Sequence, residues 1–153
     1  VARPLMVAKV RGRFTEVSGT VEVGETLAET SVRARAAAAS ISTNQADRDA
    51  HLRGADFFDV QTYPELTFES TAVTADSMTG TLTIKGVSRP VTFDVEFEGV
   101  QADPWGNTKA GFTATTSINR SDWGLTWNAA IEGGGVLVSD KIQITLEVEL
   151  LKS

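Results

Sequence analysis

Apolar and polar residues alternate along most of the chain with a period of two, the pattern of β-strands that bury one face. The clearest stretch is residues 91–98, where Val91, Phe93, Val95 and Phe97 alternate with polar residues. Alternation also occurs in six other stretches, at residues 17–23, 31–41, 66–73, 78–85, 110–118 and 142–150. Residues 3–14 are mixed, with an apolar run at residues 5–7, and are interpreted as a first strand that bends at Gly12. Eight strands at this spacing predict an antiparallel up-and-down β-barrel, because closing a sheet removes its exposed edges.

Residues 31–41 allow two interpretations of the barrel interior. Alternate positions from Val32 to Ala38 share one face, and three of these four side chains are methyl groups. Successive alanines would also suit a helix, but Arg33 and Arg35 alternate with the apolar face and favour a strand. A barrel lined by such small residues has room for a ligand. Bulky residues from facing strands could instead fill the same space.

The alternation stops between residues 45 and 64. Residues 45–53 contain no Gly or Pro and several good helix formers, so a short helix is expected there. Gly54 can end this helix by adopting the left-handed conformation. Phe57 and Phe58 follow in a short polar loop, and Tyr63-Pro64 favours extended backbone before the next strand. We expect this helix to plug or flank one end of the barrel.

Size and composition restrict the classes of function. At 153 residues the chain has the length of one domain, so residues 1–153 are interpreted as a single unit. The net charge of −6 argues against nucleic acid as a partner. No apolar stretch reaches the ~20 residues of a membrane-spanning helix. No leader peptide is visible, but Val1 is not an initiator Met, so the cellular compartment stays open.

Little in the sequence points to catalysis or to a cofactor. One His and no Cys exclude the usual metal clusters of His and Cys ligands, and nucleotide-binding and nucleophile-elbow motifs are absent. The one group of reactive side chains comprises His51, Asp56, Asp59 and Tyr63. A His oriented by a carboxylate can act as a general base, but the same residues can cap the helix and satisfy loop amides. We expect the structural role, no enzyme activity and no cofactor.

Several runs resemble the YceI-like, polyisoprenoid-binding, lipocalin-like family. They are LMVAKVRGRF (residues 5–14), RDAHLRGADFFDV (48–60), YPELTF (63–68), GTLTIKGVSRPV (80–91), AGF (110–112) and INRSDWGLTW (118–127). Two features depart from the family pattern. Pro4 stands where members often carry a His, and the short strand that usually precedes this point is largely missing. A shortened first strand predicts a less completely closed barrel.

The resemblance implies an eight-stranded antiparallel lipocalin-like barrel whose apolar lumen holds a long lipid tail. The ligand classes that it implies are isoprenoids, quinone-like molecules and fatty-acid derivatives. It also implies a bacterial source and a homodimer. The expected function is therefore to carry or sequester a long apolar molecule. Two alternatives remain: an isomerase or cyclase that uses His51 with Asp56 or Asp59 in the same cavity, and an interaction module without a ligand.

The predicted ligand-binding residues are mainly large apolar side chains, together with small ones that leave room for the ligand. Trp123 and Trp127 fit either a lumen wall or ordinary core packing. Two arginines at the start of the chain are candidate contacts for a ligand head group, or simply the solvated face of a strand. The full set is Met6, Phe14, Ala34, Ala36, Phe57, Phe58, Phe68, Leu82, Phe93, Phe97, Phe112, Trp123, Trp127, Arg11 and Arg13.

Overall fold

The computed structural model describes residues 12–22, 24–102, 108–126, 130–131, 135–136 and 140–152. Within them, one α-helix, α1, spans Ala46–Arg53. Short 3-10 helices span Leu27–Glu29 (η1), Ala38–Ser40 (η2) and Arg120–Trp123 (η3). The strands are β1 (Arg13–Phe14), β2 (Val17–Glu22), β3 (Ser31–Ala37), β4 (Ile41–Ser42), β5 (Glu65–Val73), β6 (Ser77–Ile84), β7 (Val87–Ala102), β8 (Thr108–Asn119), β9 (Ala130–Ile131), β10 (Gly135–Val136) and β11 (Lys141–Lys152). The prediction of a mainly β chain with one helix is confirmed.

One antiparallel sheet contains seven of these strands, in the order β11-β8-β7-β6-β5-β3-β2. Most neighbours in the sheet are also neighbours in the sequence, as in an up-and-down arrangement. The remaining short strands form two separate pairs, β1 with β4 and β9 with β10.

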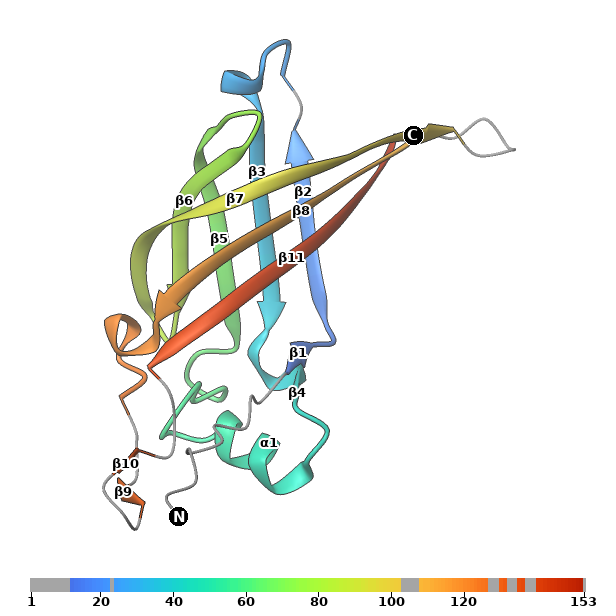
Figure 1. Cartoon of the computed structure of the whole chain (residues 1–153). Coiled ribbons are helices and arrows are strands. Elements are labelled where there is room, and N and C mark those ends of the chain that lie inside the picture. Colours follow the sequence, from blue (N-terminus) through green and yellow to red (C-terminus); the bar gives the residue numbers. More distant parts are fainter. Residues whose placement is uncertain are drawn as a thin grey trace, which may run out of the picture.

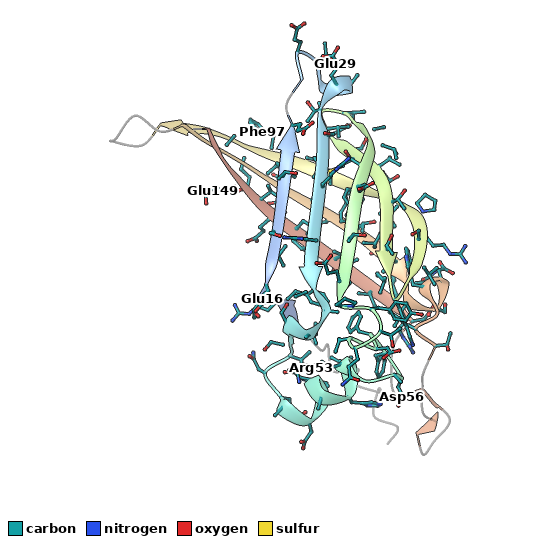
Figure 2. All side chains as sticks on the ribbon, turned by 180° about the vertical axis from the view of Figure 1, so that it is seen from behind. Glu16, Glu29, Arg53, Asp56, Phe97 and Glu149 are labelled. Carbon is teal, nitrogen blue, oxygen red and sulfur yellow. The ribbon has the colours of Figure 1, made fainter. Side chains whose placement is uncertain are left out.

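The sheet is strongly curled. In Figure 1, β7, β8 and β11 cross in front of β2, β3 and β5, and Figure 2 shows the opposite order from behind. The two halves of the sheet therefore face each other across an interior and form a half-barrel. Helix α1 lies at the end of this interior where β3 finishes and β5 begins (Figure 1).

We expected a closed barrel of eight strands, but the described residues form an open, curled sheet of seven. Its edge strands are β2 and β11, and no ladder joins them within the described residues. Of the first expected strand, at residues 3–14, the described part contains only β1, which pairs with β4 outside the main sheet. Because neighbouring strands are antiparallel, the first and last of seven strands run in the same direction. They therefore cannot close the sheet as an antiparallel pair.

Residues 31–41 form a strand, as the alternating arginines predicted, but the strand is shorter than expected. β3 ends at Ala37, and the 3-10 turn η2 follows before β4. Within β3, Arg33 and Arg35 lie on the exposed face, near Glu69 and Glu65 respectively. The inner face carries Val32, Ala34 and Ala36, which are buried or half-buried.

The expected strands at residues 78–85 and 91–98 leave residues 86–90 as their connection, but the structure has a two-residue turn at Lys85 and Gly86. Both residues have positive φ, 51° and 75°, as a tight type I′ hairpin requires. Strand β7 therefore resumes at Val87, and Pro90 lies within it, opposite Thr81. The expected start of this strand was wrong, because Arg89 and Pro90 do not fit the apolar alternation and yet belong to the strand.

The predicted helix is confirmed, but its expected ending is wrong. The Gln45 side chain accepts a hydrogen bond from the Arg48 N–H at the start of α1. At the other end Gly54 has φ −79° and ψ 178°, which is extended and not left-handed. The Gly54 C=O instead accepts hydrogen bonds from the N–H groups of Phe57 and Asp59. The glycine thereby begins the next loop in place of forming a left-handed cap.

The hydrophobic core lies between the two halves of the sheet. Phe68 from β5 meets Phe93 from β7 edge to face, with ring centroids 5.2 Å apart. Gly80 on β6 makes room for this pair, since a Cβ there would lie 2.5 Å from Cζ of Phe68. The buried cluster consists of Val32, Phe57, Phe68, Met78, Leu82, Ile84, Val91, Phe93, Ala114, Ile118, Trp123 and Leu125.

Candidate ligand-binding site

The strand registers arrange the inner face in rows that cross the sheet. One row runs from Gly19 through Ala34 and Phe68 to Leu82. On the other half of the sheet, Phe97, Phe112 and Val148 are neighbours on adjacent strands. These rows are almost entirely apolar, so the interior is suited to apolar contents.

One part of this interior is filled by the protein itself. Phe68, Met78 and Phe93 are 3%, 1% and 1% exposed, respectively. They belong to β5, β6 and β7, where the sheet turns from one half to the other. Packing at this corner therefore leaves no accessible apolar surface on these side chains.

The inner face near the two edge strands is only partly covered. Ala34 and Ala36 on β3 are half-buried, and so are Ile142, Ile144 and Leu146 on β11. All five project from the inner rows of the sheet. The small residues of β3 and the branched residues of β11 thus form partly accessible apolar surface on the inner face, near the two edges of the sheet. We call this surface the apolar trough.

At the end of the trough away from α1, the inner face is openly exposed. Phe97 is 58% exposed, although it lies only four positions beyond the buried Phe93 on the same strand. β6 pairs with β7 only as far as Asp94, so Phe97 has no β6 residue beside it. Figure 2 shows Phe97 and Glu149 far from Arg53 and Asp56, which lie near the helix. We call this the open end.

A hollow of about 490 Å³ lies at the open end. A register shift between Phe97 and Gly99 forms a β-bulge beside it. The Glu98 carboxylate at this bulge accepts a hydrogen bond from the Thr113 hydroxyl. The lining residues combine apolar surface with carboxylates: Glu98, Gly99, Ala110, Gly111, Phe112, Glu147, Val148 and Glu149.

The opposite end of the trough carries a cap made by α1 and the loop after it. Phe58 in this loop packs against the buried cluster. Its ring meets that of Phe14 on β1 edge to face, with centroids 5.7 Å apart. Phe14 and Phe58 are both half-buried. We call this the capped end.

Hydrogen bonds hold the loop of the capped end to its surroundings. The Phe58 N–H donates to the Leu52 C=O at 3.0 Å, and the Val60 N–H donates to the Arg53 C=O at 3.0 Å. From the β6–β7 turn, Lys85 Nζ donates to the Ala55 C=O at 2.9 Å. The cap is therefore tied both to α1 and to the sheet.

A buried polar contact anchors α1 itself. The Asp49 carboxylate accepts hydrogen bonds from the N–H of Thr43, at 2.8 Å, and from its hydroxyl. The bond from the Thr43 hydroxyl is the main cause that lowers the pKa of Asp49, while burial opposes it. The Thr43 N–H, Arg53 and Arg48 lower this pKa further. Arg48 also donates to the Thr43 C=O at 2.8 Å.

The 3-10 helix η3 fixes another side of the core. Trp123 is 3% exposed, and its Nε1–H donates to the Leu82 C=O at 2.9 Å. The neighbouring Arg120 is 4% exposed and donates to the Leu125 C=O. Sequence reasoning did not single out Arg120, Thr43 or Asp49, because their partners are identified only by the folded chain.

The structure brings most of the predicted ligand-binding residues to this interior. Ala34, Ala36 and Phe112 are half-buried on the inner face, whereas Phe68, Leu82, Phe93 and Trp123 are packed in the core. Phe97 lies at the open end, and Phe14, Phe57 and Phe58 lie at the capped end. Met6, Trp127 and Arg11 lie outside the described residues.

The predicted polar contacts lie away from the trough. Arg13 on β1 is exposed. His51 on α1 is within 2.9 Å of an Asp56 carboxylate oxygen, and the side chains are 41% and 52% exposed. The His51 ring also meets Phe57 edge to face at 5.1 Å. The His–Asp pair of the enzyme alternative therefore exists, but on the accessible surface of the cap.

No group of three or more His, Cys, Asp or Glu side chains in the part of the chain that the structure describes is arranged to hold a metal ion. Among the helices of the same described residues, none is long and apolar enough to cross a membrane.

Comparisons with other proteins agree with this architecture. A sequence model described as the YceI-like domain matches residues 1–150. A UPF0312 protein of Staphylococcus aureus strain N315 is 38% identical over 148 residues, which cover 95% of this chain and 86% of that protein. A UPF0312 protein of Pseudomonas putida strain W619 is 46% identical over 120 residues, covering 74% of this chain and 58% of that protein.

Solved structures show the same fold. The YCEI protein of Campylobacter jejuni matches with a TM-score of 0.84 and 32% identity, covering 99% of this chain and 90% of that one. BcnA of Burkholderia cenocepacia matches with a TM-score of 0.78 and 26% identity, covering 95% and 90% of the two chains.

Proposed function

Because the chain belongs to the YceI-like domain family, we propose that it binds one long apolar molecule inside the curled sheet and carries or sequesters it. The proposed ligand is an isoprenoid, a quinone-like molecule or a fatty-acid derivative. Residues 1–153 form a single binding domain in this proposal, and its action is binding without catalysis.

The observation that carries the proposal is the accessible apolar trough. Ala34 and Ala36 on one side, and Ile142, Ile144 and Leu146 on the other, face inward but remain half-buried. Covering apolar surface is worth about 25 cal/mol per Å². A chain that buries about 300 Å² would gain about 7.5 kcal/mol before the costs of association. Apolar contact alone therefore supports binding, with selectivity left to the dimensions of the trough.

The proposed binding residues are those that line the trough or close its ends. Ala34, Ala36 and Phe112 contact the ligand directly, Phe97 covers it at the open end, and Phe14 and Phe58 meet it at the capped end. Phe68, Leu82, Phe93 and Trp123 form the packed wall behind them. Met6, Trp127 and the head-group contacts of Arg11 and Arg13 remain predictions.

We also propose that one further strand closes the sheet into the predicted barrel of eight strands. A strand that runs opposite to both β2 and β11 would pair with each of them in antiparallel fashion. The Glu16 C=O points toward β3, because it accepts a hydrogen bond from the Ala37 N–H. The N–H and C=O groups of successive residues in a strand point to alternate sides, so those of Val17, Gly19 and Val21 point to the free edge of β2. Slow hydrogen exchange at these three amides would support closure, whereas fast exchange would show an open edge.

Native mass spectrometry of the purified protein, followed by solvent extraction and lipid analysis, tests the proposed function. We expect a stoichiometric adduct that carries a long alkyl or prenyl chain, either as purified or after addition of quinones, prenyl phosphates and fatty amides. If none of these compounds binds, the carrier function is wrong and a ligand-free interaction module becomes the better interpretation. The same mass spectra test the homodimer, which stays a prediction.

A second candidate function is an isomerase or cyclase that uses His51 with Asp56 in the same cavity. The contact of 2.9 Å between the two side chains favours it, although the pair lies on the accessible surface of the cap. This function predicts turnover of the bound molecule. His51→Ala should then abolish turnover while ligand affinity survives. If the bound molecule is recovered chemically unchanged from the wild-type protein, the enzyme alternative is wrong.

A further inference from the structure

The two ends of the trough differ in how firmly they are closed. At the capped end, Phe14 and Phe58 meet ring to ring at 5.7 Å, and backbone hydrogen bonds of 3.0 Å hold Phe58 to Leu52 and Val60 to Arg53. Lys85 adds a bond of 2.9 Å between the loop and the sheet. An opening at this end would have to break several of these contacts together.

The open end has no comparable closure among the described residues. Phe97 is 58% exposed, although its neighbours in the row, Phe112 and Val148, are half-buried apolar residues. The exposed fraction along β7 rises from 1% at Phe93 to 58% at Phe97. An apolar chain can therefore reach the trough from this end without displacing any hydrogen-bonded element of the cap.

From this asymmetry, and resting on the proposed function, we infer that the ligand enters at the open end with its tail first, and that the Phe14–Phe58 ring pair stops the tail. The pair then determines the longest chain that the protein accepts. Ligand polarity follows as well: any polar head group remains near Phe97 at the open end, so Arg13, which lies on β1 at the capped end, would not contact it.

The position of the ring pair suits a stop. The inner row at this end consists of Val17, Ala36 and Leu66, of which Ala36 and Leu66 are half-buried and Val17 is 55% exposed. A tail can lie along these side chains until it meets the rings. From Ile142 to Val148 the inner face of β11 extends for about 20 Å. That length corresponds to roughly 16 to 18 bonds of an extended chain.

Binding of saturated primary alcohols of roughly 10 to 24 carbons tests the inference, because their neutral head group is constant and only length varies. Displacement of a fluorescent naphthylamine probe gives the affinity for each length. In Phe58→Ala the length of tightest binding should increase by about four carbons, since roughly 5 Å of ring depth is removed. Phe14→Ala removes the other half of the pair and should shift the optimum in the same direction.

Phe97→Ala is the matched control, since it makes the same substitution at the open end. It should weaken binding about equally for all lengths and leave the optimum unchanged. Thermal unfolding of each variant verifies that it is folded before binding is compared, and Phe58→Leu replaces Phe58→Ala if the latter does not fold.

The chain length of tightest binding in the three variants shows which end of the trough stops the tail. A shift in Phe58→Ala and Phe14→Ala, but not in Phe97→Ala, supports the stop at the capped end. A shift only in Phe97→Ala reverses the direction of entry and overturns the inference. An unchanged optimum in all variants, with binding retained, shows that the rings do not limit length. If the wild-type protein binds neither the alcohols nor the quinones, prenyl phosphates and fatty amides, the proposed function itself fails. Binding of the latter compounds alone shows that the length of an apolar tail does not set the affinity, and overturns the inference.

Discussion

Among single residues, Asp49 is one whose hydrogen bonds attach the helix of the cap to the residue after β4. Its carboxylate joins α1 to Thr43, the residue that follows β4. Arg48, the preceding residue on the helix, donates hydrogen bonds to the same threonine. Asp49 is 7% exposed. Loss of the carboxylate would leave the Thr43 N–H and hydroxyl buried without their acceptor, which is costly in a folded protein.

Asp49→Ala should therefore lower the midpoint of urea unfolding. Asp47→Ala, an exposed carboxylate on the same helix, is the control and should change the midpoint much less. Equal midpoints for the two variants would show that the Thr43 contact does not stabilise the cap.

The same residue predicts a dependence of stability on pH. The pKa of Asp49 lies below its ordinary value of 3.8, so the folded protein holds the ionised form more strongly than the unfolded chain does. This contribution is complete above the unfolded pKa and is lost as pH falls through the lower, folded pKa. Unfolding midpoints between pH 2 and pH 6 should fall on acidification below about 4. The fall should be shallower in Asp49→Asn, and identical slopes would contradict the assignment.

At the scale of strands, the Phe68–Phe93 contact depends on Gly80 between them. A Cβ at Gly80 would lie 2.3 Å from the Glu69 C=O and 2.5 Å from Cζ of Phe68. Gly80→Ala should destabilise the protein by about 1–3 kcal/mol, the usual cost of overpacking. Gly111→Ala is the control, because its nearest atom would be 3.6 Å away. Chemical denaturation of both variants measures the difference, and equal losses would contradict the close approach.

Most strands could be predicted from the sequence because each buries one face, and burial of one face imposes a period of two. The alternation of Arg33 and Arg35 correctly favoured strand over helix in an alanine-rich segment. The β6–β7 turn was misplaced because Arg89 and Pro90 interrupt the apolar alternation, although the strand continues through them. The Gly54 conformation also escaped prediction, because the bonds that its C=O accepts depend on the path of the following loop.

At the scale of the whole molecule, the candidate site was predicted in composition but not in arrangement. The small residues Ala34 and Ala36 lie half-buried on the inner face, and the ligand space that they predict stays a prediction. Which apolar residues are core and which line the trough depends on how the two halves of the sheet cross, and alternation contains no information about that crossing. Phe93 and Phe97 have the same pattern in the sequence, yet one is buried and the other exposed.

Filling the trough should weaken ligand binding without unfolding the protein. Ala36→Trp places a large side chain among Val17 and Leu66 on the inner face, so binding of a long-chain alcohol should fall by at least about tenfold, which is about 1.4 kcal/mol. Ala50→Trp, on the exposed surface of α1, is the control for the added indole. A folded Ala36→Trp variant that binds as the wild-type protein does would show that the trough is not the binding site.

A ligand that binds only the folded protein should also stabilise it. At a concentration one hundred times its dissociation constant, the gain is about 2.7 kcal/mol. The thermal midpoint should therefore rise with ligand concentration in the wild-type protein and stay constant in Ala36→Trp. A rise of equal size in both proteins would show that the ligand binds elsewhere.

The odd number of strands in the sheet has a practical consequence for attaching this protein to other objects. With seven antiparallel strands, β2 starts beside α1, while β11 finishes at Lys152 near the open end (Figure 1). A tether joined after β11 would obstruct the open end, where the ligand is inferred to enter. A tether on the exposed face of α1 would leave the open end accessible. Protein anchored to a sensor surface through α1 should consequently load faster than protein anchored through the end of β11.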